Sequence, residues 1–160
     1  AAERIHPNNV RRVVRALEAA LSGEQVNQYT ASESPYDALV IGLEMERSAL
    51  YERINKRVDI MLEQGLEQEV RSLLEHGISP DCQSMQSIGY RQMVWYLNGS
   101  MPYDEAVEKL KQATRNFAKR QITWYKKMPY IKWLQLEKQP NYANVVGRIC
   151  EILVEKGFSL

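Results

Sequence analysis

A short apolar run constrains the fold of this chain more than any other feature. Residues 37–43 read Asp-Ala-Leu-Val-Ile-Gly-Leu, and a helical pattern follows from Arg47 or Ser48 onward. A run of this length that is rich in valine and isoleucine predicts a strand buried on both faces, as in a parallel sheet. A buried strand that leads directly into a helix is typical of α/β proteins. We therefore predict an α/β fold that is predominantly helical.

Periodic apolar residues predict the remaining elements. Helices are expected after the turn at residues 6–9, from residue 47 or 48 to the glycine at 65, and over 66–76, 87–98 and 109–127. A second strand is expected over residues 130–136, where apolar and polar residues alternate. A final helix after Pro140 is expected to bury its apolar residues, which are Tyr142, Val145, Val146, Ile149, Ile152 and Leu153.

Composition excludes several classes of protein. The 160 residues suffice for one domain with a hydrophobic core, since 44% of them are hydrophobic and 26% are charged. Cys82 and Cys150 are far apart, and neither histidine has a Cys or His neighbour. This pattern argues against a disulfide scaffold or a zinc site and is consistent with a reducing cytosol. No apolar run approaches the roughly 20 residues that span a bilayer.

The formal net charge is only +1, so any binding of nucleic acid must come from local clusters of charge. The most prominent cluster is the segment 109–127, and no Asp or Glu occurs from Lys109 through Leu136. At helical spacing, one side of this segment carries Lys111, Arg115, Lys119, Thr123 and Lys126. Another side is mostly apolar and is expected to bury against a core, and it carries Val107, Leu110, Thr114, Phe117, Gln121, Trp124 and Met128. Basic side chains interleaved with aromatic ones suit an anionic polymer, and a solvated surface helix explains the same pattern equally well.

Two smaller clusters point in the same direction. The first helix carries three arginines away from its apolar side, Arg11, Arg12 and Arg15. They either bind phosphates or form an ordinary solvent-exposed face. Residues 90–92 place a tyrosine ring, an arginine fork and an amide within one turn. Such a set suits the recognition of a splayed-out RNA base, and a core tyrosine beside a surface arginine is the simpler alternative.

Two arginines in the helix after the first strand are candidates for contact with a ligand. On the helical wheel, Arg57 lies at the margin of the apolar arc and Arg53 lies just beyond it. An arginine at such a margin either reaches into a cleft or extends to water. A structural ion pair with Glu52 or Asp59 is an equally good interpretation of Arg57.

Several short blocks occur in the order found in one known family. They are His6-Pro-Asn-Asn with Arg12 and Arg15-Ala-Leu-Glu, Ser34-Pro-Tyr-Asp-Ala-Leu with Ile41-Gly-Leu, Leu50-Tyr-Glu-Arg-Ile with Arg57-Val-Asp, Ser87-Ile-Gly-Tyr-Arg-Gln, Thr114-Arg, Ala118-Lys-Arg-Gln-Ile-Thr-Trp, and Met128-Pro with Ile131 and Trp133. Through these blocks the chain resembles the tRNA dimethylallyltransferases over nearly its whole length. Each block alone is a weak signal, whereas their common order is a strong one.

The resemblance implies an enzyme that moves a dimethylallyl group from dimethylallyl diphosphate to an adenosine of tRNA. The acceptor is the exocyclic amine of the adenosine immediately 3′ of the anticodon, which the family flips into a channel. The implied fold is a P-loop-kinase-like core with a helical insertion. Residues 1–33 would be the end of the tRNA-binding insertion, and residues 34–160 the C-terminal part of the core. A cytoplasmic location and a Mg²⁺ ion, with ligands outside this chain, are implied as well.

The resemblance also assigns roles to particular residues. Three segments would contact the anticodon stem-loop of tRNA, namely 11–15, 86–91 and 119–126. Together with the basic helix, they give the candidate tRNA-binding residues Arg11, Arg12, Arg15, Gln86, Gly89, Tyr90, Arg91, Arg115, Lys119, Arg120, Thr123, Trp124 and Lys126. From its placement at the margin of the apolar arc, Arg57, with Arg53 as second choice, is the candidate catalytic residue that would assist in stabilising the diphosphate. No metal ligand is expected in this chain.

The sequence departs from the family in two respects. The phosphate loop of the form GxxxxGK[ST], with its lysine, and the aspartate expected as general base do not occur. We therefore expect a C-terminal portion that lacks the N-terminal half and does not transfer a prenyl group by itself. Arg11 stands where a glutamine is common and Val14 where a serine can stand, so phosphate contact is expected to be stronger and specific hydrogen bonding weaker. A non-catalytic RNA-binding module and a helical scaffold that meets an acidic protein are the alternatives.

Overall fold

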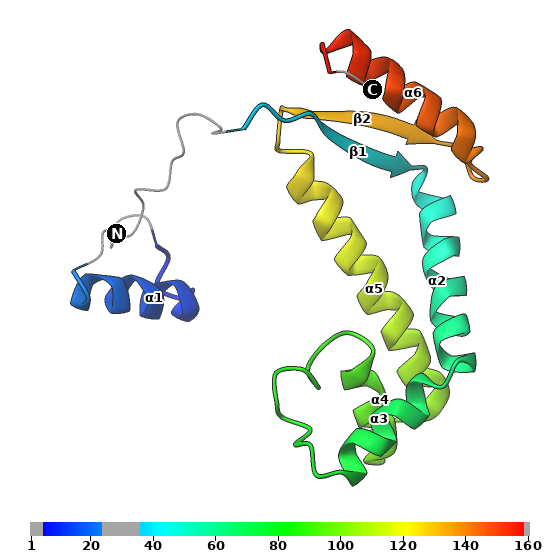
Figure 1. Cartoon of the computed structure of the whole chain (residues 1–160). Helices are drawn as coiled ribbons and strands as arrows, with labels where there is room; N and C mark the ends of the chain where they lie inside the picture. Colours follow the sequence, from blue (N-terminus) through cyan, green and yellow to red (C-terminus); the bar gives the residue numbers. More distant parts are fainter. Residues whose placement is uncertain (1–4, 24–35, 159–160) are drawn as a thin grey trace. The chain divides into compact units, whose positions relative to one another are not determined.

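The computed structural model describes residues 5–23 and 36–158, and the chain divides into two units, residues 1–38 and 39–160 (Figure 1). The predicted boundary between residues 33 and 34 lies outside the described residues. Each unit is considered by itself below.

The first unit contains one helix, α1, over Val10–Leu21. Asn9 precedes it and caps it, because its side-chain oxygen accepts a hydrogen bond from the backbone N–H of Arg12 at 3.4 Å. The predicted helix after the turn at residues 6–9 is therefore confirmed. None of its apolar residues is buried, and Leu17 and Leu21 are exposed.

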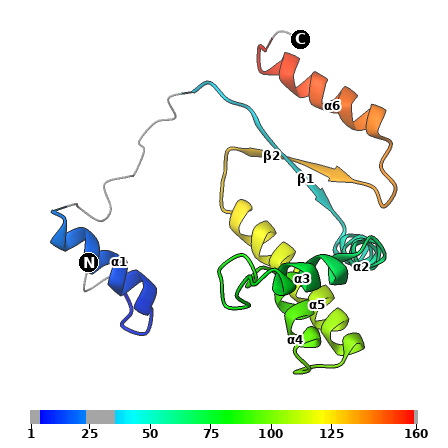
Figure 2. The ribbon, with the colours of Figure 1, turned by 60° about the horizontal axis from the view of Figure 1, so that its bottom comes forward.

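Four helices build the core of the second unit. They are α2 (Arg47–Glu63), α3 (Leu66–Glu75), α4 (Tyr90–Leu97) and α5 (Tyr103–Tyr125). α2 packs on α5, and α3 and α4 pack together near the N-terminal end of α5 (Figures 1 and 2). The buried side chains that they share with the loop before α4 are Val58, Leu66, Val70, Met85, Met93, Val94, Ala106 and Leu110. The helical predictions over these segments are confirmed, including the start of α2 at Arg47.

Two parallel strands pair beside these helices, β1 over Val40–Met45 and β2 over Ile131–Leu136. Their register places Gly42 opposite Trp133. The parallel pairing and the helix that directly follows β1 confirm the α/β prediction. The prediction that the first strand is buried on both faces is wrong, because Val40 is 38% exposed and Leu43 is 52% exposed. The described residues contain one strand neighbour for β1, and this pair is too small to cover both faces.

The last helix, α6, covers Tyr142–Glu155 and begins where Asn141 accepts a hydrogen bond from the backbone N–H of Asn144 at 3.3 Å. Its position after Pro140 confirms the prediction, but the expected burial of its apolar side is wrong. No residue of α6 is buried, and Tyr142 and Val146 are more than half exposed. Val145, Ile149, Ile152 and Leu153 are half-buried, so the two strands cover only part of this side.

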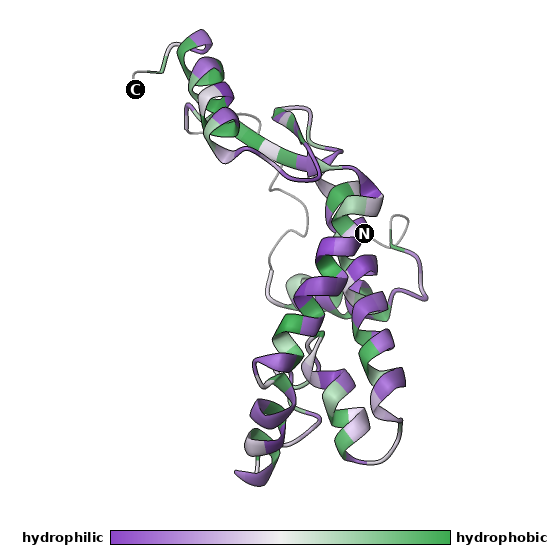
Figure 3. Cartoon of the chain, turned by 90° about the vertical axis from the view of Figure 1, so that its right-hand side faces the viewer, coloured by the Kyte–Doolittle hydropathy of each residue, from purple (hydrophilic) through white to green (hydrophobic). Residues whose placement is uncertain are grey.

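The apolar side expected for α5 is correct at its N-terminal half and wrong at its C-terminal half. Ala106 and Leu110 are buried in the core, whereas Phe117 is 45% exposed and Trp124 is 58% exposed. Coloured by hydropathy, the helices show hydrophilic and hydrophobic residues side by side (Figure 3). With Tyr125, which is 41% exposed, the C-terminal half therefore presents three aromatic rings to solvent among basic side chains.

The sheet depends on the absence of a side chain at Gly42. A Cβ atom placed there would lie 2.7 Å from Cε3 of Trp133 and 2.8 Å from Cγ2 of Ile131. Both distances are far below van der Waals contact, so the indole ring occupies the space that any other residue would need.

We expect Gly42→Ala to lower the free energy of unfolding by about 1–3 kcal/mol through overpacking against Trp133. Urea denaturation followed by intrinsic fluorescence measures this change. Gly147→Ala in α6 is the matched control, because nothing lies within 4 Å of its added Cβ. The control is expected to raise stability by about 0.5–1 kcal/mol, as alanine favours a helix over glycine. Equal midpoints for the wild type and Gly42→Ala would contradict the proposed packing.

Candidate nucleic-acid interface

The C-terminal half of α5 carries a shallow groove with basic and aromatic walls. We call it the α5 groove, and it is lined by Asn116, Lys119, Arg120, Thr123, Trp124 and Lys127. These residues form two rows at a spacing of four, 116–120–124 and 119–123–127, so they share one helix face. Three of the six are cations and none is acidic. The groove therefore combines positive charge with an exposed indole.

Aromatic contacts define the walls of this surface. The Trp124 and Tyr125 rings meet edge to face, with centroids 4.9 Å apart and planes at 76°. The guanidinium carbon of Arg120 lies 5.9 Å from the centre of the Phe117 ring. Since Trp124 is 58% exposed, one face of its ring is accessible for stacking. In the described part of the chain, no carboxylate pairs with the groove's three cations. An indole beside such cations is the arrangement by which proteins bind single-stranded nucleic acid.

The other cations on the predicted basic side of this helix are held by neighbouring elements. Arg115 donates a hydrogen bond through Nη1 to Oδ1 of Asn55 in α2 at 2.7 Å. Lys111 pairs with Asp59 at 2.6 Å, and Lys126 pairs with Glu44 in β1 at 2.8 Å. The predicted basic side of this helix is therefore divided. Lys119 and Thr123 lie in the α5 groove, whereas Lys111, Arg115 and Lys126 tie the helix to α2 and β1.

The segment 86–91 is the second candidate for RNA contact, and hydrogen bonds to Gln92 and Pro80 hold it in place. Gly89 precedes α4 with φ of 105°, a conformation that favours glycine. Its N–H donates to Oε1 of Gln92 at 2.9 Å, and Gln92 is only 1% exposed. Gln86 donates through Nε2 to the carbonyl of Pro80 at 2.9 Å. These bonds fix where the side chains of the segment point.

Arg91 lies over a neighbouring indole ring. Its guanidinium carbon is 5.3 Å from the centre of the Trp95 ring, one turn along α4. Its Nε is buried and has no hydrogen-bond partner among the described residues. The Arg91 side chain is therefore half-buried, and the Trp95 ring of the same helix covers part of it.

Tyr90 links α4 to α3. Its hydroxyl donates a hydrogen bond to the carboxylate of Glu69. This bond raises the pKa of Tyr90 above its ordinary value, and burial adds to the effect. The hydroxyl group of Tyr90 therefore already has a hydrogen-bond partner. The ring that was predicted to stack on a base also links α4 to α3.

Arg11, Arg12 and Arg15 lie on α1, and all three are exposed. They belong to the first unit, which is described separately from the α5 groove and the segment 86–91. The predicted grouping of the three segments on one RNA surface stays a prediction.

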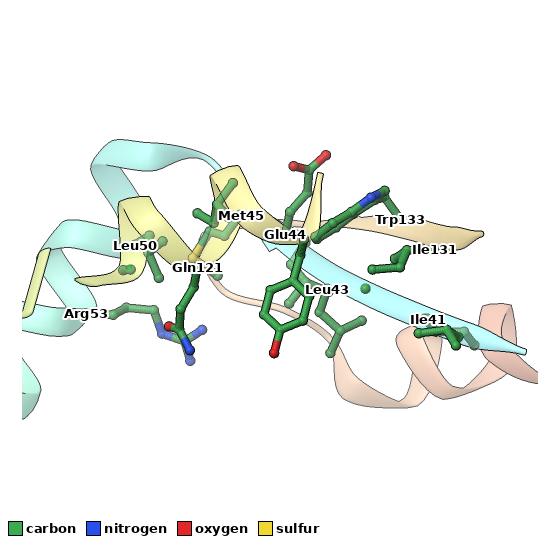
Figure 4. Close-up of a pocket in the computed structure, with 15 residues that line it drawn as sticks. Ile41, Leu43, Glu44, Met45, Leu50, Arg53, Gln121, Ile131 and Trp133 are labelled. Carbon is green, nitrogen blue, oxygen red and sulfur yellow. The ribbon is translucent and has the colours of Figure 1, made fainter. Parts of the chain in front are cut away.

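An apolar cavity of about 440 Å³ lies between the two strands, α2 and α5. Leu50 and Arg53 of α2 line it together with Gln121 of α5 (Figure 4). Tyr125 of α5 lines it as well. Arg53 also donates to the Tyr142 hydroxyl at 3.4 Å, whereas Arg57 is exposed and does not line the cavity. The geometry thus places Arg53, the second choice, nearer to a cavity than Arg57.

The ion pair considered for Arg57 does not form. Glu52 pairs with Lys138 at 2.6 Å, and Asp59 pairs with Lys111. Within the part of the chain that the structure describes, the Arg57 side chain has no ion pair or hydrogen bond. Its predicted catalytic role stays a prediction.

Two residues of the site and one helix cap escaped the sequence analysis. Asn116 and Lys127 belong to the α5 groove, and the repeat of four residues from 116 and from 119 was the signal that could have revealed them. Glu46 caps α2 by accepting hydrogen bonds from Ser48 and from the N–H of Ala49, which lower its pKa to about 2. A glutamate is an uncommon cap, so no pattern indicated it.

Across residues 5–23 and 36–158, no three His, Cys, Asp or Glu side chains come together as a metal site. We therefore assign no residue of this chain to the Mg²⁺ that the family resemblance implies. None of the helices in the described ranges is long and apolar enough to cross a membrane.

Comparison with known proteins identifies the family. The model of the IPP transferase family matches residues 1–128. The chain belongs to the IPP transferase family. The tRNA dimethylallyltransferase of Pelotomaculum thermopropionicum is 45% identical over an alignment of 159 residues, which covers 97% of this chain and 48% of the relative. The tRNA dimethylallyltransferase of Shouchella clausii is 46% identical over an alignment of 162 positions, which covers 99% of this chain and 52% of the relative.

Solved structures agree with this assignment. The tRNA isopentenylpyrophosphate transferase of Bacillus halodurans matches with a TM-score of 0.70 and 42% identity, covering 98% of this chain and 49% of that one. The corresponding transferase of Staphylococcus epidermidis gives a TM-score of 0.65 and 43% identity, covering 94% and 52%. This IPP transferase chain thus spans about half the length of the relatives it matches, and the family resemblance drawn from the sequence blocks is confirmed.

In this IPP transferase chain, we expect Tyr90→Phe to lower the free energy of unfolding by about 1 kcal/mol at pH 7, because Glu69 loses its donor. The pKa of Tyr90 is raised on folding, so the contribution is complete below the ordinary value of 10.0 and is lost as pH rises through the raised pKa. Denaturant titrations at pH 7 and at alkaline pH measure both effects. Tyr96→Phe is the control, since its ring contacts Tyr103 edge to face without a hydroxyl hydrogen bond in the described region. An unchanged midpoint for Tyr90→Phe at pH 7 would show that the tie contributes nothing.

Proposed function

We propose that this chain is part of a tRNA dimethylallyltransferase, a cytoplasmic enzyme that modifies tRNA. The observation that carries the proposal is the match of the IPP transferase family to residues 1–128. Relatives named tRNA dimethylallyltransferase at 45–46% identity support it. We also propose that residues 34–160 are the C-terminal part of a P-loop-kinase-like core, with α1 at the end of a tRNA-binding insertion.

The proposed reaction is a displacement at an allylic carbon. The exocyclic amine of the adenosine 3′ of the anticodon attacks dimethylallyl diphosphate. A C–N bond forms, the C–O bond to diphosphate breaks, and the amine proton passes to a base that we assign to no residue of this chain. Negative charge develops on the departing diphosphate, and nearby cations stabilise it. Arg53 and Arg57 are the candidates for that role from this half of the enzyme.

The role proposed for this chain is to supply much of the tRNA-binding surface. The α5 groove supports it with unpaired cations around an accessible indole, a composition that suits phosphates and an unstacked base. The segment 86–91, with its fixed backbone, is the second contact in this proposal. The flipping of the target adenosine would require both surfaces to hold the loop open.

A non-catalytic RNA-binding module is the second candidate function. It is favoured by the α5 groove, whose three cations and exposed indole suit the binding of RNA by itself. In this case the chain binds tRNA without transferring the prenyl group. The two candidates share the RNA surface and differ in turnover.

A fluorescence-anisotropy titration with an anticodon stem-loop tests the RNA surface. The chain is expected to bind a loop with adenosine 3′ of the anticodon more tightly than a loop with that base changed. Because phosphate contacts release counterions, the logarithm of the affinity should fall linearly with the logarithm of the salt concentration. Lys119→Ala, in the α5 groove, should reduce that slope by about one, whereas Lys132→Ala, an exposed lysine of β2, should not. A shallow salt dependence with no base preference would favour an acidic protein partner instead.

Arginine substitutions in the complete enzyme test the catalytic assignment. If Arg53 or Arg57 stabilises the departing diphosphate, replacement by alanine is expected to lower turnover at least tenfold and weaken the binding of dimethylallyl diphosphate. Lys56→Ala, on the same helix and also exposed, is the control. Unchanged prenyl-donor affinity and turnover in both arginine variants would remove them from the mechanism.

A further inference from the structure

Two adjacent lysines at the end of α5 have opposite surroundings. Lys126 and Lys127 carry the same charge and side chain, and both are exposed residues. Only Lys126 belongs to the segment that the sequence assigns to tRNA. The structure separates the two by what each ammonium group faces.

Lys126 faces the sheet. Its Nζ lies 2.8 Å from Oε2 of Glu44 in β1 and 6.0 Å from the centre of the Trp133 ring in β2. Glu44 is 25% exposed as a side chain and Lys126 is 53% exposed, so the pair is partly sheltered. Figure 4 shows the Glu44 carboxylate beside Trp133 on one side of β1, directed away from Arg53 and Gln121. Lys126 therefore fastens the C-terminal end of α5 to the outer side of the sheet.

Lys127 faces the α5 groove. It continues the row of Lys119 and Thr123 at a spacing of four, and it lines the groove together with Arg120 and Trp124. Its backbone N–H donates a hydrogen bond to the carbonyl of Trp124 at 3.2 Å, and this bond holds the backbone of Lys127 in place. In the described part of the chain, its ammonium group has no ion pair or hydrogen bond.

From this contrast we propose that Lys127 binds an RNA phosphate with Lys119 and Arg120, and that Lys126 is a positioning residue. The inference rests on the proposed function, because it assigns residues within the same RNA surface. A phosphate gains more from an unpaired cation than from one that must first leave a carboxylate. Contact through Lys126 would break the tie to Glu44 and loosen the helix end that carries the groove.

Single alanine substitutions at the two positions test the inference, since each removes the same charge from neighbouring residues. Binding of the anticodon stem-loop is measured by anisotropy at several salt concentrations, and thermal unfolding is followed for each variant. Lys127→Ala should weaken binding severalfold and reduce the salt slope by roughly 0.7–0.9, the value of one phosphate contact, with an unchanged melting temperature. Lys126→Ala should keep the salt slope and lower the melting temperature by about 2 °C.

Conservative variants complete the design. Lys126→Arg retains the pair with Glu44 and should restore the melting temperature, and Lys127→Arg should restore the salt slope. A reduced slope for Lys126→Ala, or an unchanged slope for Lys127→Ala, overturns the inference. Failure of the unaltered chain to bind the stem-loop overturns the proposed RNA surface and the phosphate role of Lys127 together. The melting temperatures still decide whether Lys126 is the anchor.

Discussion

The packing of α5 is the interaction on which the second unit depends. Ala106 and Leu110 of this helix are essentially fully buried against residues from α2, α3 and α4. Burial of a single leucine side chain contributes about 1.5–3 kcal/mol, so this end of the helix is held by the hydrophobic effect. Beyond residue 110 no side chain of α5 is buried, and polar ties to α2 and β1 take over. One helix thus joins the helical core to the sheet.

This change of support along α5 explains why its C-terminal half can serve as a binding surface. Ala118 and Ile122 face the apolar cavity, while the α5 groove opens on the opposite side of the same turns. Cations at the border, Arg115 and Lys126, are used to hold the helix. Cations in the groove keep their charge available. A rigid helix that presents such side chains holds them more precisely than a loop would.

Much of this organisation could be predicted from the sequence. The apolar run before Arg47 indicated the strand, the helix after it and the α/β class, because local periodicity carries that information. Ordered sequence blocks indicated the family. Burial was harder to predict, since Phe117, Trp124 and the apolar side of α6 satisfy a helical pattern and still lie at the surface. Periodicity shows which residues share a face, and only the neighbouring elements decide whether that face is covered.

The division of the basic residues could not be predicted either. Lys126 and Lys127 are one residue apart, which is a rotation of about 100° around a helix axis. This rotation directs Lys126 to the carboxylate of Glu44 in β1 and Lys127 to the α5 groove. The partner Glu44 is 82 residues away in the sequence, so no local pattern connects it to Lys126. A long-range ion pair of this kind depends on the tertiary fold.

The contact between Gly42 and Trp133 has a consequence for the evolution of the family. Because the indole fills the space of a side chain at position 42, Gly42 is not free to change alone. A relative that gains a side chain at the position of Gly42 must have a smaller residue than tryptophan opposite it. The two positions, 91 residues apart in the chain, should therefore covary across IPP transferases, with glycine accompanying the large aromatic ring.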